Sequence, residues 1–160
     1  MKVMRLLSSL KHDESERGIF HLGRALVKNE HTSIIVSSAD EDNDLVRRLK
    51  RDGNIYHQLH VNKKSWLSLL QVSALRHLIE KYEPDVIHVH SRTPAWILHL
   101  ALRRARVRRF PKLVSTMYGF YPINKYSQAL LNVDTIITVS DSVTQYLKKG
   151  LRIEDVDPKV

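Results

Sequence analysis

Short apolar runs alternate with amphipathic segments along the whole chain. The runs are rich in Val and Ile, which is typical of strands buried in a sheet, whereas the segments between them repeat apolar residues at helical spacing. These patterns predict six strands, at residues 3–8, 33–38, 55–61, 85–90, 113–117 and 135–139.

Each predicted strand is followed by a predicted helix. The first helix begins at Glu16 with Ser15 as its N-cap, and Gly53 ends the second. The third is expected to bury one face, which includes Leu70 and Ile79. The expected helices cover residues 16–27, 44–52, 65–82, 95 to about 106, 124–131 and 141–149.

Six strand–helix steps in strict alternation predict an α/β fold whose parallel sheet is covered on both faces. With right-handed crossovers this is a doubly wound, Rossmann-like domain spanning residues 1–160. Ligands of such sheets bind beyond the carboxyl ends of the strands. The loops of interest are therefore residues 9–15, 90–94 and 117–122.

Composition narrows the functional classes. Hydrophobic residues make up 42% and charged residues 27%, which is typical of a soluble globular domain. The absence of cysteine excludes disulfides and thiolate metal sites and suits a cytoplasmic location. No run approaches the ~18 apolar residues of a membrane-spanning helix, and no signal peptide is expected.

Motifs for common cofactors are missing from the predicted loops. Gly18 and Gly23, the earliest glycines, fall inside the first predicted helix, so no G-x-G-x-x-G follows the first strand. A conventional dinucleotide site is therefore not expected, and neither a P-loop nor an H-E-x-x-H motif is present.

Two histidines share one face of the fourth predicted strand. Since no third ligand is spaced near them, a metal site is not expected. His88 is interpreted as a packed or hydrogen-bonded core residue. His90 stands at the carboxyl end, where a neutral imidazole can hydrogen-bond a sugar hydroxyl, and functional and structural roles are evenly matched there.

The next loops add a cation and aromatic rings. Arg92 is suited to phosphate or carboxylate, and Trp96 is equally compatible with core packing and with ring stacking. Tyr118, Phe120 and Tyr121 surround Gly119, and aromatic faces with polar tips suit carbohydrate or lipid headgroups.

These motifs together resemble the N-terminal domain of retaining GT-B glycosyltransferases of the group 1, or GT4-like, family. Residues 15–18 (S-E-R-G), 84–91 (P-D-V-I-H-V-H-S) and 134–142 (D-T-I-I-T-V-S-D-S) match its first helix, fourth strand and sixth strand. Residues 91–96 (S-R-T-P-A-W) and 116–127 (T-M-Y-G-F-Y-P-I-N-K-Y-S) are similar to a branch linked with lipopolysaccharide-type surface glycans.

The resemblance implies transfer of a sugar from a nucleotide-sugar donor to a glycan or lipid-linked acceptor, with no metal or other cofactor. It implies that a second Rossmann-like domain, expected to lie outside these 160 residues, makes most of the contacts with the donor. The isolated domain is therefore not expected to catalyse sugar transfer. His90 and Tyr118 match catalytic positions. The acceptor-binding positions correspond to Arg92, Trp96, Tyr121, Asn124, Lys125 and Tyr126.

The expected donor loop, which includes Glu16 and Gly119, departs from the family pattern. Asp13 and Glu14 replace a Gly-Gly pair that lets backbone N–H groups approach phosphates, and Tyr118 replaces a histidine. Two carboxylates facing an anion should weaken donor binding. The alternative reading is therefore a degenerate or stand-alone domain that binds a glycan or a partner without turnover.

The net charge of +9 is unevenly distributed, and its densest stretch holds five arginines. Its cations complement the negative end of a helix dipole, and they also suit an anionic membrane surface at the inner face of the cytoplasmic membrane. Nucleic acid is not an expected partner, because no binding motif accompanies the charge. We call this stretch the arginine block; it consists of Arg103, Arg104, Arg106, Arg108 and Arg109.

Overall fold

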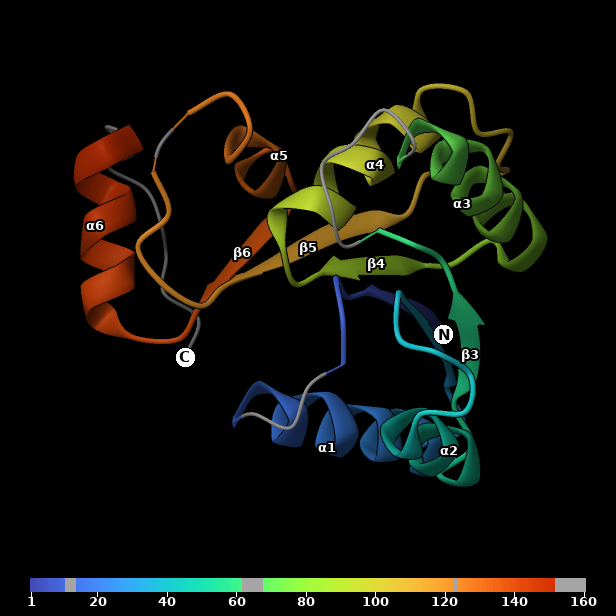
Figure 1. Ribbon diagram of the computed structural model, residues 1–160. Helices are drawn as coiled ribbons and strands as arrows, with labels where there is room; N and C mark the ends of the chain where they lie inside the picture. The colour runs from blue at the N-terminus through green and yellow to red at the C-terminus, as the bar shows by residue number, and fades with distance from the viewer. Residues whose placement is uncertain (11–13, 62–67, 123, 152–160) are drawn as a thin grey trace.

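A computed structural model describes residues 1–10, 14–61, 68–122 and 124–151 of the chain. This part contains one sheet in which every pair of neighbouring strands is parallel, in the order β3-β2-β1-β4-β5-β6 (Figure 1). The strands are β1 (Lys2–Leu6), β2 (Thr32–Ser37), β3 (Ile55–Gln58), β4 (Val86–Val89), β5 (Lys112–Met117) and β6 (Thr135–Thr138).

Helices lie on both faces of the sheet. In Figure 1, α1 and α2 lie on one face, α3, α4 and α5 on the other, and α6 beside the β6 end. The helices are α1 (Glu14–Lys28), α2 (Asp44–Arg51), α3 (Ser68–Tyr82), α4 (Arg92–Leu102), α5 (Gln128–Leu131) and α6 (Asp141–Leu151).

The strand order reverses between β1 and β4. The chain first moves outward from β1 to β3, then returns through α3 to β4 and continues to β6. This is the doubly wound, Rossmann-like topology that the alternating pattern predicted, and its switch point lies at the carboxyl ends of β1 and β4.

The apolar core has two layers because the central strands are buried on both faces. One layer includes Met4, Leu6 and Ile87 with the apolar residues of α3 and α4. The smaller layer joins Ile35 of β2 to Leu49 and neighbouring residues of α1 and α2.

Two aspartates fix the starts of neighbouring strands in the same way. Asp85, just before β4, donates its N–H to the Lys2 carbonyl and accepts the Lys2 N–H through its carboxylate, at 2.9 and 2.7 Å. Asp134, just before β6, makes the same pair of bonds to Leu113 of β5, at 2.9 and 2.8 Å. Each aspartate thus pairs two parallel strands at their first residues.

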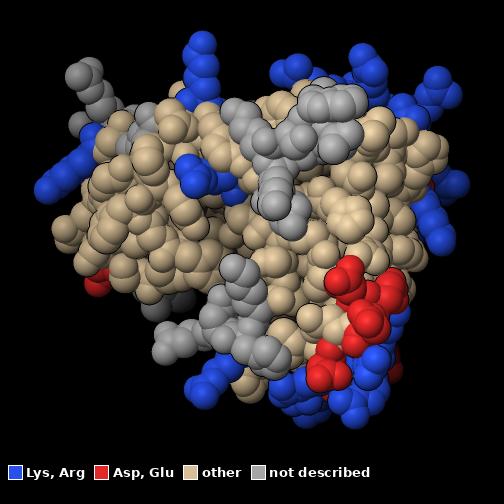
Figure 2. All heavy atoms as spheres, viewed as in Figure 1, with Lys and Arg blue, Asp and Glu red and all other residues tan. Residues whose placement is uncertain are grey.

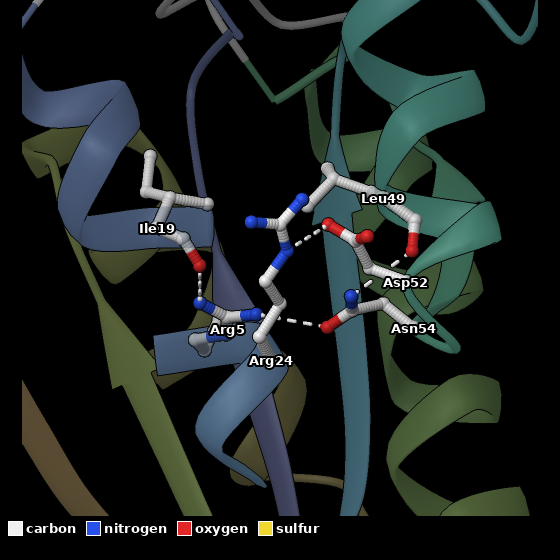
Figure 3. A network of polar contacts seen from close by, with 6 residues as sticks. All are labelled: Arg5, Ile19, Arg24, Leu49, Asp52 and Asn54. Atoms are coloured by element: carbon white, nitrogen blue, oxygen red, sulfur yellow. Dashed lines mark hydrogen bonds and ion pairs between the residues drawn. The ribbon is translucent and has the colours of Figure 1, made fainter. Parts of the chain in front are cut away.

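A fully buried arginine lies between β1 and α1 (Figure 3). The Arg5 guanidinium donates to the Ile19 carbonyl at 2.5 Å and to Asn54 Oδ1 at 3.2 Å, and Ser33 Oγ accepts a third bond. A Cβ on Gly23 would lie 2.7 Å from Arg5 Nη2 and 2.6 Å from Asn54 Oδ1. Only glycine therefore lets α1 approach this network so closely.

Several predicted boundaries differ from the structure. Ser15 as an N-cap is wrong, because α1 already includes it. The helix expected from residue 95 begins at Arg92, since Pro94 fits a first turn where no intrahelical N–H is used. Leu70, expected to be buried, is 65% exposed. Residues 65–67 of the third predicted helix lie outside the described residues.

The helix expected over residues 124–131 is the short α5. Asn124 Oδ1 accepts the N–H groups of Tyr126 and Ser127, at 3.1 and 2.9 Å, and this contact holds a turn where the helix was expected to begin. Within the described residues, no helix is long and apolar enough to cross a membrane.

Candidate functional site

The two residues predicted to be catalytic meet at the carboxyl edge of the sheet. His90 follows β4 and Tyr118 follows β5, and these strands are neighbours. His90 Nδ1 lies 2.7 Å from the Tyr118 hydroxyl, and the rings stack with centroids 6.0 Å apart. Tyr118 is 38% exposed. The pair therefore forms one hydrogen-bonded unit at the edge where ligands of such sheets bind.

A second pair lies deeper in the sheet. His88 Nε2 and Thr116 Oγ1 are 2.7 Å apart and both side chains are buried, which confirms the interpretation of His88 as a hydrogen-bonded core residue. Burial, and then the Arg5 cation, lowers the pKa of His88 to about 4. Burial, His88 and Arg5 lower the pKa of His90 well below 6.5. Both imidazoles are thus neutral at pH 7.

Arg92 packs over two aromatic rings. Its guanidinium carbon lies 5.1 Å from the centroid of the Tyr121 ring and 5.2 Å from that of Tyr126. The Tyr126 hydroxyl hydrogen-bonds Thr93 Oγ1, and the Tyr121 carbonyl accepts a bond of 2.9 Å from the Tyr146 hydroxyl. Three of the predicted acceptor-binding residues therefore form a single cluster.

The N-terminus of α4 lies in this cluster. Ser91 is the N-cap by position, yet its hydroxyl makes no capping bond. Ser91 Oγ and His90 Nε2 are both enclosed, and neither has a hydrogen-bond partner within the described residues. Two enclosed polar atoms thus remain available beside the first turn of a helix.

The other predicted acceptor residues have different surroundings. Trp96 is half-buried and packs against the main core, which favours the packing role. Asn124 is exposed but uses its carbonyl oxygen within the turn, and Lys125 is exposed beside it. The structure therefore groups Arg92 with the tyrosines and leaves Trp96 mainly structural.

The structure describes only part of the predicted donor loop. Asp13 lies outside the described residues, and Glu14 and Glu16 belong to the first turns of α1, so their proposed repulsion of a donor stays a prediction. Gly119 has no atom within 4 Å of a Cβ built on it. In the described part of the chain, no group of three His, Asp or Glu residues could hold a metal ion.

The arginine block lies at the opposite, amino edge of the sheet, between the end of α4 and the start of β5. Arg106 N–H donates to Glu80 Oε1 at 2.9 Å, and the Arg108 side chain lies 3.8 Å from Glu83. An open pocket here is lined by Arg76, Glu80, Arg104 and Arg106. Figure 2 shows basic side chains projecting at the upper right, around the region of α3 and α4.

Sequence reasoning did not identify Arg5 or Thr93 as residues that support the site at the carboxyl edge. Arg5 is a lone cation inside an apolar strand pattern, and that break in the pattern was the only available signal. The bond between Thr93 and Tyr126 joins residues 33 positions apart, which no local pattern reports.

The all-parallel order and the chemistry at the carboxyl edge define a Rossmann-like domain of the kind that forms one half of a GT-B fold. Residues 15–159 match Glycosyltransferase Family 4, and the chain belongs to this family. The family suggested by the sequence motifs is thereby confirmed. No curated protein matches the chain.

Solved structures agree with this fold. A glycosyltransferase from Rickettsia africae ESF-5 is 26% identical, with a TM-score of 0.74, over 96% of this chain and 40% of that one. The lipopolysaccharide outer core galactosyltransferase WaaB (12% identical, TM-score 0.65) is matched over 93% and 42% of the respective chains. A UDP-N-acetylglucosamine 2-epimerase (13%, TM-score 0.59) is matched over 96% and 46%. The last two show the fold alone, and the chain spans less than half of each relative.

Proposed function

We propose that the chain is the acceptor-side half of a glycosyltransferase that moves a sugar from a nucleotide-sugar donor to a glycan or lipid-linked acceptor. The observation that carries the proposal is the grouping of His90, Tyr118 and Arg92 at the carboxyl edge, in a chain of Glycosyltransferase Family 4. A neutral His90 paired with Tyr118 suits hydrogen bonding to sugar hydroxyls. Catalysis would rest on positioning the acceptor and on stabilising the departing diphosphate.

A second Rossmann-like domain would supply most donor contacts, and the length of the relatives supports it, since the chain covers 40% of the Rickettsia africae protein. An immunoblot of source cells is expected to show a band at roughly twice the 18.6 kDa of this chain, as two such domains require. A band at 18.6 kDa would contradict this part of the proposal.

The acceptor we propose belongs to surface polysaccharide or lipopolysaccharide synthesis. The motifs at residues 91–96 and 116–127 support this class, and so does the fold shared with a lipopolysaccharide galactosyltransferase. We place the protein in the cytoplasm, with the arginine block against the inner face of the membrane. Phe110, 67% exposed directly after the block, supports this contact by offering an apolar side chain to lipid.

The alternative is a domain that binds a glycan or partner without turnover. Asp13, Glu14 and Tyr118, which stand where the family pattern has Gly-Gly and His, favour it. The two functions differ in whether any donor is consumed.

The test is donor consumption and sugar transfer by the full-length protein, with a panel of nucleotide sugars and glycolipid extracted from its source. Transfer is expected, and His90→Ala should reduce kcat by a factor of ~10² or more. His77→Ala, on an exposed position of α3, is the matched control and should leave kcat unchanged. Binding of the extract without consumption of any donor would instead establish the non-catalytic alternative.

A further inference from the structure

We propose that the acceptor carries an anionic group, phosphate or carboxylate, and that Arg92 with the first turn of α4 binds it. This inference rests on the proposed function and names the chemistry of its acceptor. Four independent features of this edge support it.

The first feature is the fixed position of the guanidinium. The guanidinium carbon lies over the Tyr121 ring and over the Tyr126 ring, 5.1 and 5.2 Å from their centroids. The Tyr126 hydroxyl and the Tyr121 main-chain carbonyl are themselves hydrogen-bonded. A guanidinium packed over aromatic rings can still donate its N–H groups to an anion. Because the side chain is ordered in advance, less entropy is lost when an oxyanion binds.

The second feature is the missing counter-ion. Some arginines of the described chain have carboxylates close by, such as Arg24, 2.8 Å from Asp52, and Arg108, 3.8 Å from Glu83, whereas exposed ones such as Arg103 and Arg109 have none within 4.0 Å in that part of the chain. No carboxylate within the described residues lies within 4.0 Å of Arg92. A half-buried cation without an anion favours an external one.

The third feature is where the charge lies. Arg92 is the first residue of α4, and the positive end of a helix dipole disfavours a cation there. A bound anion reverses this effect, because it is attracted by the guanidinium and by the dipole together. The arrangement thus lowers helix stability in the free protein and favours anion binding.

The fourth feature is the pair of unpartnered polar atoms. Ser91 Oγ and His90 Nε2 are enclosed without a hydrogen-bond partner in the described part of the molecule. Such an atom loses its hydrogen bonds to water on folding without gaining another partner. Because both atoms have almost no accessible surface, a bound sugar would reach them only after the side chains turn toward it. The Ser91 hydroxyl could then donate to the anion, and Nε2 could pair with a sugar hydroxyl.

The experiment is an NMR titration of the ¹⁵N-labelled chain with glucose, glucose 6-phosphate, glucuronate and inorganic phosphate. The two charged sugars are expected to bind at least tenfold more tightly than glucose and to shift the amides of Arg92 and Thr93. The separate phosphate and carboxylate probes show which anion is preferred. Equal affinities for glucose and for both charged sugars would overturn the proposal.

Variants separate this site from general charge attraction. Arg92→Gln should abolish the preference for charged sugars, and Arg92→Lys, which keeps the charge but loses the planar contact with the rings, should retain part of it. Arg103→Gln removes an equal charge at the other edge and should change nothing. An equal effect of Arg103→Gln, or shifts confined to the arginine block, would contradict the proposal even if Arg92→Gln fails to fold.

The proposed function has a separate outcome. Transfer by the full-length protein to a neutral acceptor, with no preference for charged sugars, would remove the anion site and keep the transferase. Selective binding of charged sugars at Arg92 without any transfer would keep the anion site and remove the transferase.

Discussion

Arg5 and His88 are the two ionisable residues among the buried polar residues of the strands in the described part of the chain. They are aligned with each other on β1 and β4, and both side chains are buried. Burial lowers the pKa of Arg5 to about 10, which leaves the guanidinium charged at pH 7. The cation in turn helps to keep both histidines neutral. A residue far from solvent thereby adds to the effect of burial, which is the main cause of the neutral state of His90.

The close contact of α1 with this network can be tested at Gly23. In Gly23→Ala the new Cβ would lie under 3 Å from Arg5 Nη2 and from Asn54 Oδ1, so the network must shift. We expect a loss of about 1–3 kcal/mol of stability by urea unfolding. Gly18→Ala, in the same helix with no atom within 4 Å of the added Cβ, is the control and should stabilise by up to ~1 kcal/mol.

Stability should fall with acidification because of His88. Its pKa is about 4 in the folded chain and 6.5 in the unfolded one, so between these values the unfolded chain binds the extra proton. The contribution is fully present above pH 6.5 and decreases as the pH falls toward 4. Between pH 7 and pH 5 the loss is roughly 2 kcal/mol from His88, and His90 acts in the same direction.

Urea unfolding at pH 7, 6 and 5 measures this slope. His88→Gln should flatten it, whereas His60→Gln, at an exposed position, should not. A wild-type slope that survives in His88→Gln would show that other groups cause the acid sensitivity.

At the scale of elements, the strands were easier to predict than the site loops. Val and Ile runs identify buried strands because both faces of a central parallel strand are apolar. The start of α4 was missed, because residues 90–94 were assigned to a loop although Pro94 fits the first turn of a helix. The clustering of Arg92 with Tyr121 and Tyr126 depends on contacts between segments distant in the sequence, so only their residue types could be predicted.

The aspartate before β6 offers a test at this scale. The N–H of Leu113 and then the Lys112 ammonium lower the pKa of Asp134, so the carboxylate is ionised when it holds the two strands. Asp134→Ala should cost about 0.5–1 kcal/mol and speed hydrogen exchange of the Leu113 amide. Asp42→Ala, at an exposed turn, is the control. Unchanged exchange at Leu113 would contradict a role for this carboxylate.

At the scale of the whole molecule, the candidate site and the arginine block lie at opposite edges of one sheet. The amino edge is basic and includes the exposed Phe110, whereas the carboxyl edge carries the paired His90 and Tyr118. Binding to a surface and binding to sugar can therefore be altered independently.

Vesicle co-sedimentation tests the membrane contact. Binding should rise with the fraction of phosphatidylglycerol and fall with salt, since each cation near an anionic surface contributes ~1 kcal/mol. The triple change Arg103→Gln, Arg104→Gln and Arg106→Gln should weaken binding by roughly a hundredfold. A control with the same charge loss at Lys28, Arg47 and Arg51, on the helices that cover the other face of the sheet, should weaken binding much less (Figure 1). Binding indifferent to lipid charge would remove the membrane proposal.

The opposite placement of the two edges has a consequence for acceptor length. A strand of six residues such as β5 spans about 20 Å at ~3.3 Å per residue. With the arginine block on the bilayer and the strands perpendicular to it, the cluster around Arg92 would stand about that far from the lipid headgroups. An acceptor sugar attached directly to its lipid would fall short of it, whereas one at the end of an already extended glycan would reach. The fold itself would then act as a ruler that admits long, partly built glycans and leaves the first sugars to other enzymes.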